Sequence, residues 1–155
     1  MPEITSFAIL LHSLSAVIWV GGMFFAYVVL RPSLGFMDPP QRLTLWANVF
    51  QRFFPWVWGI IIVLPATGYA QVLMDFGGFK SAGLHINIMH ITGWVMIALF
   101  LYLYVAPYRR FREFVAASEW SAAAGQLNII RRIVGTNTVL GVLTVAIGAS
   151  GRFWG

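Results

Sequence analysis

Two histidines, His12 and His90, each lie in a long apolar run that carries no formally charged side chain. Both runs are long enough to cross a bilayer, and a histidine inside a membrane-spanning helix is costly, so it indicates a function. If the helices alternate in direction, both imidazoles fall at similar depth, near the start of the first and third spans. Two neutral imidazoles that face each other across a helical bundle can hold a b-type haem, a metal or a quinone. The alternative is that both are buried polar residues bonded across helices.

The helix faces that carry these histidines favour the first interpretation, because they are rich in small residues. His12 shares its face with Trp19 and several small side chains, and Gly93 lies one turn after His90. Small faces pack against neighbouring helices or leave room for a flat cofactor. Gly93 removes a side chain where a porphyrin edge needs space. Trp19 and Trp94 then pack either on the porphyrin or in the protein core.

Other polar side chains would complete such a site. The second ring nitrogen of His12 needs an acceptor, either a backbone carbonyl or Ser15. Lys80 and Arg152 are the bases available to the two propionates of a haem. His85 lies at the membrane edge and points about 140° away from His90 around the helix, so it is the less favoured metal ligand.

The composition sets these residues in an integral membrane protein. The chain has 155 residues, of which 59% are hydrophobic and only 10% charged, whereas about 25% of a soluble domain is charged. Apolar segments that reach the roughly 20 residues needed to cross the hydrocarbon core lie at residues 4–30, 41–74, 84–106 and 131–150. Arg31-Pro32 and Pro107 are expected to end the first and third spans, because a residue before proline disfavours helix. Residues 108–128 are predicted to form an interfacial helix, a turn and then the segment that leads into the fourth span. The sequence predicts one all-α domain, a transmembrane four-helix bundle.

The basic residues predict its orientation. Eight of the ten lie on one side of the predicted bundle: Arg31, Arg42, Arg52, Arg109, Arg110, Arg112, Arg131 and Arg132. The positive-inside rule puts that side in the cytoplasm. Both termini, His12 and His90 then lie toward the periplasm, in a bacterial inner membrane. The net charge of +5 thus reflects orientation in the lipid bilayer and predicts no nucleic-acid partner. Glycine-rich faces permit a homo-oligomer.

Several kinds of chemistry are excluded. The chain has no cysteine, so it has no disulfide, thiolate metal site or cysteine nucleophile. Its five carboxylates all lie in predicted loops or near the termini. The predicted spans therefore contain no paired-acid hydrolase site and no proton-relay carboxylate.

Three stretches resemble the CopD-like family of four-helix membrane proteins. They are Leu11-His12 through Trp19-Val20-Gly21-Gly22 to Arg31-Pro32; Met89-His90 with Gly93 and the segment Tyr104 to Phe111; and Ile130-Arg131-Arg132 with Asn137, Leu140-Gly141 and Gly148. The fold is also similar to small membrane b-type cytochromes and, more distantly, to HemJ-type protoporphyrinogen oxidases. HemJ proteins pair an early histidine with a lysine in a later helix. Here the only lysine, Lys80, lies in a loop and His90 occupies the third helix, which favours two histidine ligands. The resemblance implies haem or copper without choosing between them.

The function that we expect is electron transfer by a membrane cytochrome b, an oxidoreductase role. His12 and His90 would be the axial ligands of one haem b near the outer face, between quinone and a periplasmic redox partner. The first alternative is a copper-binding or copper-transport protein with His12, His90 and Met89 or His85 as ligands. Others are a HemJ-like oxidase and a structural subunit whose histidines only join helices.

Overall fold

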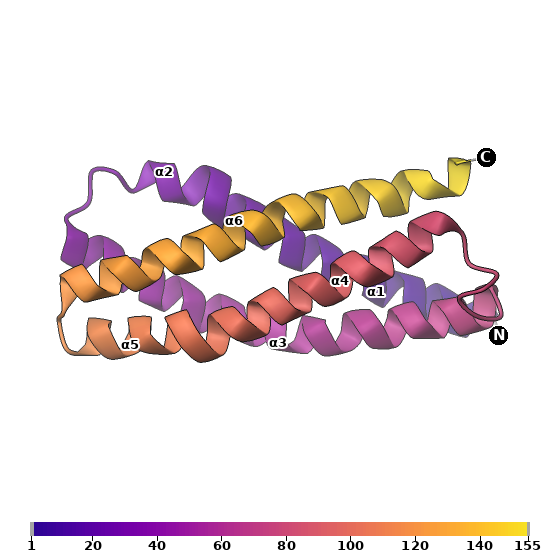
Figure 1. Ribbon diagram of the computed structural model, residues 1–155, viewed down its shortest axis with the longest axis horizontal. Helices are drawn as coiled ribbons and strands as arrows, with labels where there is room; N and C mark the ends of the chain where they lie inside the picture. The colour runs from indigo at the N-terminus through magenta and orange to yellow at the C-terminus, as the bar shows by residue number, and fades with distance from the viewer. Residues whose placement is uncertain (1, 155) are drawn as a thin grey trace.

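The protein is a bundle of four long helical segments that run alternately up and down (Figure 1). The structure, a computed structural model, describes residues 2–154, and within that range it contains helices, turns and loops but no strand. The helical stretches that are long and apolar enough to cross a membrane are Glu3–Ser33, Pro39–Asp75, Leu84–Ala116 and Trp120–Phe153. The chain is therefore an all-α, multi-pass membrane protein, as the sequence predicted.

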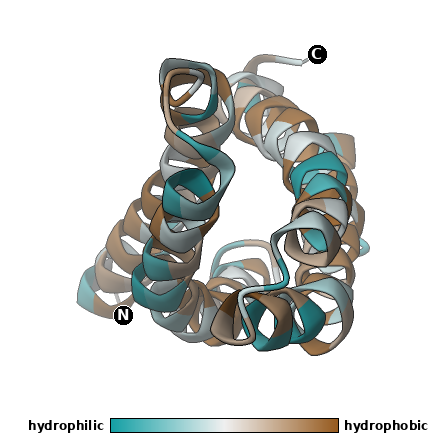
Figure 2. Ribbon diagram, turned by 90° about the vertical axis from the view of Figure 1, so that its left-hand side faces the viewer, coloured by the Kyte–Doolittle hydropathy of each residue, from teal (hydrophilic) through white to brown (hydrophobic). Residues whose placement is uncertain are grey.

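The two ends of the bundle differ in what they contain. Both termini lie at one end, together with the loop 76–83; we call this the terminal end (Figure 1). The loop 34–38 and the turn 117–119 lie at the opposite end. Because most arginines border those two connections, we call it the basic end. Figure 2 looks onto the basic end, where hydrophilic residues gather on the nearer parts of the ribbon.

The first and third spans continue through the prolines that were expected to end them. α1 (Pro2–Phe24) passes into a π-helical segment, η1 (Phe25–Leu30), and then into α2 (Arg31–Ser33). In the same way α4 (Leu84–Leu103) continues through the π-helical η2 (Tyr104–Tyr108) into α5 (Arg109–Ala116). A proline lacks an N–H and its ring meets the carbonyl four residues earlier. A wider π-helical turn at that point lets the helix go on.

The second and fourth segments are each one long helix. α3 (Pro39–Asp75) begins after the extended Asp38 and has proline in its first turn, where a missing N–H is tolerated. It contains Pro55 and Pro65 and ends before Gly77 and Gly78, whose φ values of +68° and +128° suit glycine. α6 (Trp120–Ser150) begins earlier than the predicted fourth span and ends in a short 3₁₀ turn, η3 (Gly151–Phe153).

Aromatic packing forms the core in the half of the bundle nearer the basic end. Phe50 and Phe54 stack with their ring centroids 5.0 Å apart. The ring of Tyr108 meets that of Phe54 edge to face, with a centroid-to-centroid distance of 4.7 Å. Phe111 and Ile130 are fully buried. The outward faces are apolar too, since they carry exposed residues such as Phe7, Val17, Ile62 and Val139. In a bilayer those exposed side chains meet lipid, so their exposure carries no penalty.

The terminal half of the bundle is more polar inside. The fully buried part of the main apolar cluster extends along α3 only to Ile60, and along α4 it starts at Met96. Beyond these points the helices bring hydroxyl, amide and imidazole groups to their contacts. Thr144 of α6 donates to the hydroxyl of Thr92 on α4 at 2.8 Å. This polar half is where the histidines lie.

Candidate functional site

His12 is held by two acceptors on the facing helix. It projects from α1 onto α3, where its Nδ1 atom lies 3.1 Å from the carbonyl oxygen of Leu64. The same nitrogen lies 3.0 Å from Oγ1 of Thr67. The expected acceptor is thus a backbone carbonyl, joined by a threonine hydroxyl, and Ser15 does not serve. The imidazole is half-buried in the seam between the two helices.

These contacts determine which ring nitrogen carries the proton. A carbonyl oxygen can only accept, so Nδ1 of His12 must donate to Leu64. The hydroxyl of Thr67 donates to the carbonyl of Val63 at 2.7 Å, which leaves its oxygen free to accept from His12. Nε2 of the neutral ring therefore keeps its lone pair. That is the state in which histidine binds a metal, with the opposite nitrogen fixed by an acceptor.

A glycine on α3 makes this approach possible. A methyl group added at Gly68 would lie 3.2 Å from Cε1 of the His12 ring. One turn along, the side-chain amide of Gln71 donates to the carbonyl of Thr67 at 3.2 Å. Leu64, Thr67 and Gly68 therefore form the part of α3 that contacts His12, and Gln71 continues the same helix face.

His90 lies in an aromatic enclosure at the seam between α3 and α4. Its ring centroid is 4.7 Å from that of Phe79, 5.3 Å from that of Tyr69 and 6.5 Å from that of Trp94. Its Nε2 atom is 3.5 Å from the hydroxyl of Tyr69, and that hydroxyl accepts a hydrogen bond from the indole of Trp94 at 3.3 Å. His90 is thus positioned mainly by ring packing.

The two histidines meet α3 at neighbouring residues but do not touch each other. His12 packs on Gly68 and His90 on Tyr69, so both reach the same turn of that helix. Consecutive residues point about 100° apart on a helix, which turns the two contacts in different directions. Within residues 2–154, no hydrogen bond or ring contact joins the two imidazoles.

The other predicted site residues lie at the terminal end in separate surroundings. His85 packs against Gly151 and faces the ring of Trp154, with centroids 6.3 Å apart. Lys80 is exposed in the loop 76–83. Arg152 is also exposed, and its guanidinium carbon lies 4.6 Å from the centroid of the Phe153 ring.

The residues proposed to accommodate a porphyrin divide into two groups. Trp19 is almost fully buried and belongs to the main apolar cluster, whereas Trp94 is 46% exposed beside His90. A methyl group added at Gly93 would meet nothing within 4 Å. The space beside this glycine is therefore not filled by another helix.

Thr67, the side-chain partner of His12, was not predicted from the sequence. The signal was a pair of polar residues, Thr67 and Gln71, one turn apart in an otherwise apolar stretch of α3. The partner of Asn137 was not predicted either. Asn137 donates to the carbonyl of Met96 at 3.1 Å and so ties α6 to α4.

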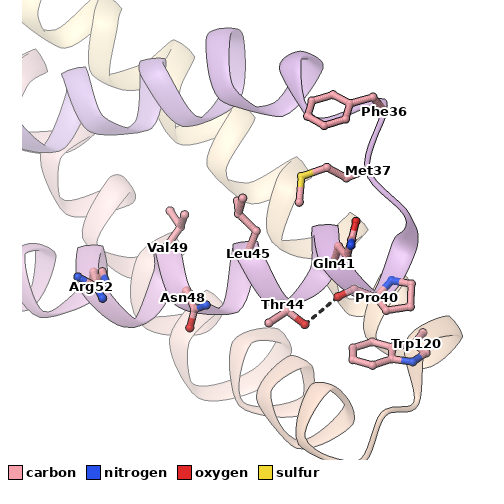
Figure 3. Close-up of a pocket in the computed structure, with 10 residues that line it drawn as sticks. All are labelled: Phe36, Met37, Pro40, Gln41, Thr44, Leu45, Asn48, Val49, Arg52 and Trp120. Carbon is pink, nitrogen blue, oxygen red and sulfur yellow. Dashed lines mark hydrogen bonds between the residues drawn. The ribbon is translucent and has the colours of Figure 1, made fainter.

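A groove of about 780 Å³ runs along α3 at the basic end and holds no histidine (Figure 3). Phe36 and Met37 of the loop border it on one side and Trp120 on the other. Arg52 is exposed at its far end beside Asn48.

Among the described residues no group of three His, Asp or Glu side chains is arranged to hold a metal ion.

Comparison with known proteins identifies the family. No match to the chain was found among curated proteins or solved structures. The sequence model of the family CopD, described as copper resistance protein D, matches residues 47–150, which include His85 and His90 but not His12. That stretch covers three of the four spans and well over half of the chain. The chain therefore belongs to the copper resistance protein D family.

Proposed function

We propose that this protein binds copper within the membrane as cargo, with His12 as its principal ligand. The observation that carries the proposal is the fixed ring of His12, whose Nδ1–H is tied to Leu64 and Thr67. Nε2 is therefore the metal-binding nitrogen, held in place before any metal arrives. Membership of a family described as copper resistance protein D supports copper as the metal, and imidazole is a suitable copper ligand.

A small number of protein ligands suits a cargo site better than a storage site. Conduction through a membrane protein requires binding that is strong enough to admit the ion and weak enough to release it. Isolated imidazoles within the described spans meet that requirement more readily than a closed cage of three or four ligands. His90 of α4, whose ring packs on Tyr69 in the same turn of α3, is the second position that we assign to copper. His85, near the terminal surface, is not needed as a ligand.

The first experiment is a copper titration of the full chain purified in detergent. Cu(I) is competed against a chromophoric chelator, and the His12→Ala, His90→Ala and His85→Ala variants are compared with the unmodified protein. We expect saturable binding that falls by at least about tenfold in affinity in the His12 variant, because a principal ligand is lost. The His85 variant serves as the matched control and should bind like the unmodified protein. Equal affinity in the His12 and His85 variants would refute the assignment.

A second candidate is the bis-histidine haem b, with quinone and a periplasmic redox partner. Two observations favour it: the free Nε2 of His12 and the open space beside Gly93. Lys80 and Arg152 are exposed at the terminal end, where they would meet the propionates. Against it, Nε2 of His90 faces the hydroxyl of Tyr69, so this ring has to turn before it can bind iron. When bound, the haem would supply one-electron chemistry, and the protein would supply two imidazoles and an apolar setting.

Colour distinguishes the two candidates. Protein purified from haem-replete cells should be colourless if it binds copper and not haem. A red preparation with low-spin haem b bands that disappear in both the His12→Ala and the His90→Ala variant would establish the cytochrome instead. We propose a bacterial inner membrane as the location, in which the positive-inside rule puts the arginine-rich basic end in the cytoplasm.

A further inference from the structure

Three arginines from three different helical segments converge on one cavity at the basic end. The cavity has a volume of about 350 Å³ and lies between the end of the first span, the start of α3 and the first half of α6. Arg31 comes from α2, Arg42 from α3 and Arg131 from α6. All three are half-buried, whereas the neighbouring Arg132 is exposed and does not line the cavity.

No acidic side chain balances these charges. None of the five carboxylates of the chain lines the cavity. Asp38 lies at the start of α3, close to Arg42 in sequence, yet within residues 2–154 the only ion pair joins Arg109 to Glu113. Three like charges around a partly enclosed, low-dielectric space repel one another unless an anion lies between them.

The arginines are partly fixed in position. Nη1 of Arg42 donates to the carbonyl of Met37 at 3.3 Å. The guanidinium carbon of Arg31 lies 5.1 Å from the centroid of the Tyr27 ring, a cation–π distance. Arg131 has no hydrogen-bond partner among the described residues. Each guanidinium carries five N–H donors, so most donors at this cavity remain available to a ligand.

The remaining walls are mostly apolar, with Asn128 as a further polar side chain. Leu43, Trp46, Phe50, Ile130 and Val134 line the inner part of the cavity. A volume of 350 Å³ is at the lower end of ligand pockets, which span about 300–1,000 Å³. It is sufficient for a phosphate group with a short organic portion. Arginine is the side chain best matched to phosphate oxygens, because it binds them with two parallel hydrogen bonds.

We propose that this cavity binds a phosphate group through Arg31, Arg42 and Arg131. The two sources of that group are an anionic phospholipid of the surrounding leaflet and a soluble phosphate compound. Basic pockets between transmembrane helices on the cytoplasmic side bind lipid headgroups elsewhere, and the apolar inner walls suit the glycerol portion of a lipid. The proposal does not depend on copper or haem, because the cavity lies at the opposite end of the bundle from the histidines.

The test measures binding to the delipidated full chain in detergent. Phosphatidylglycerol, phosphatidylcholine with the same acyl chains, and inorganic phosphate are titrated separately and detected by native mass spectrometry. Arg131→Gln removes a guanidinium that makes no hydrogen bond or ion pair within the described residues, and Arg132→Gln is its matched control. Arg31→Gln is a second variant, and circular dichroism and thermal unfolding verify that each protein is folded.

We expect phosphate-group binding that weakens about fivefold in Arg131→Gln and in Arg31→Gln, and remains within about twofold of the unmodified protein in Arg132→Gln. Phosphatidylglycerol bound in preference to phosphatidylcholine, without inorganic phosphate binding, identifies a lipid. Binding of inorganic phosphate that also displaces phosphatidylglycerol identifies a soluble phosphate compound. The proposal is overturned if neither ligand binds, or if Arg131→Gln and Arg132→Gln weaken binding equally.

Discussion

The orientation of the His12 imidazole depends on one carbonyl and one hydroxyl of α3, and both belong to the same helical turn. Leu64 fixes the tautomer, because its oxygen can only accept. Thr67 adds a second acceptor, and its own hydroxyl proton is donated to the carbonyl of Val63. Partners of this kind hold a metal-binding ring in position and raise its basicity. Their loss should therefore weaken metal binding without removing a ligand.

Thr67→Val tests this arrangement, since it removes the hydroxyl and keeps a β-branched side chain of similar size. The carbonyl of Leu64 remains, so the ring keeps its tautomer but loses one of two restraints. We expect the affinity for Cu(I) to fall about tenfold, measured by chelator competition. Thr136→Val is the control, because the hydroxyl of Thr136 donates only to its own helix at Arg132. An unchanged affinity in Thr67→Val would mean that the hydroxyl does not support the ligand.

The sequence predicted an acceptor for His12 but could not identify it. The two candidates were a backbone carbonyl and Ser15, which lies on the same helix as His12. The actual carbonyl belongs to Leu64, which is 52 residues away in the chain. Partners across a helix interface depend on the rotation and depth of two helices, and neither follows from the apolar pattern of one segment. The same reason explains why the enclosure of His90 by Tyr69, Phe79 and Trp94 was not predicted.

At the scale of elements, glycines set how closely the helices approach. A methyl group added at Gly151 would collide with Cβ and Cγ of His85, so η3 and the start of α4 lie nearly in backbone contact. One added at Gly141 would meet Val20 at 2.8 Å and Met96 at 3.1 Å. Small residues at such contacts let helices pack by van der Waals attraction, which drives association inside a membrane.

Gly151→Ala and Gly93→Ala form a matched pair for this packing. The first forces α4 away from η3, and overpacking of this kind costs about 1–3 kcal/mol of stability. The second adds a methyl group to open space in the middle of α4 and gains up to about 1 kcal/mol of helix propensity. We expect the thermal unfolding midpoint in detergent to fall by several degrees for Gly151→Ala and to hold or rise for Gly93→Ala. The opposite order would contradict the packing described here.

Helix boundaries show where sequence rules for proline fail inside a membrane protein. Pro32 and Pro107 were expected to end their spans, yet π-helical turns next to them let both helices continue. The rule that proline ends a helix is based on the lost N–H and the steric clash at the proline. It does not count the strong preference for continuous helix where backbone groups lack water. The glycines at 77 and 78, by contrast, coincide with a true break after α3.

For the whole molecule, composition and hydropathy were sufficient to predict four membrane-spanning helices and the placement of both termini at one end. Hydropathy is summed over some twenty residues of a span, so local errors have little effect on the prediction. A ligand site, in contrast, depends on single contacts. The cavity lined by Arg31, Arg42 and Arg131 illustrates the same limit. The sequence placed all three on one side of the membrane, but their convergence on one space required the packed helices.

Topology is the prediction that belongs to this scale. With the basic end in the cytoplasm, both termini should lie on the outer side of the membrane. Alkaline phosphatase fused to the C-terminus should be active, and green fluorescent protein fused there and exported by the general secretory route should remain dark. Fusions in the loop 34–38 provide the control with the opposite expected pattern. A fluorescent C-terminal fusion would show that the orientation is the reverse, with His12 toward the cytoplasm.

The assignment of Nε2 of His12 as a copper ligand is tested most directly by X-ray absorption at the copper edge. The full chain is loaded with Cu(I) in detergent, and the fine structure is compared between the unmodified protein and His12→Ala, with His85→Ala as control. We predict outer-shell scattering typical of imidazole in the unmodified protein and in His85→Ala, and its clear reduction in His12→Ala. Imidazole scattering that persists unchanged in His12→Ala would contradict the assignment and move the copper site away from this histidine.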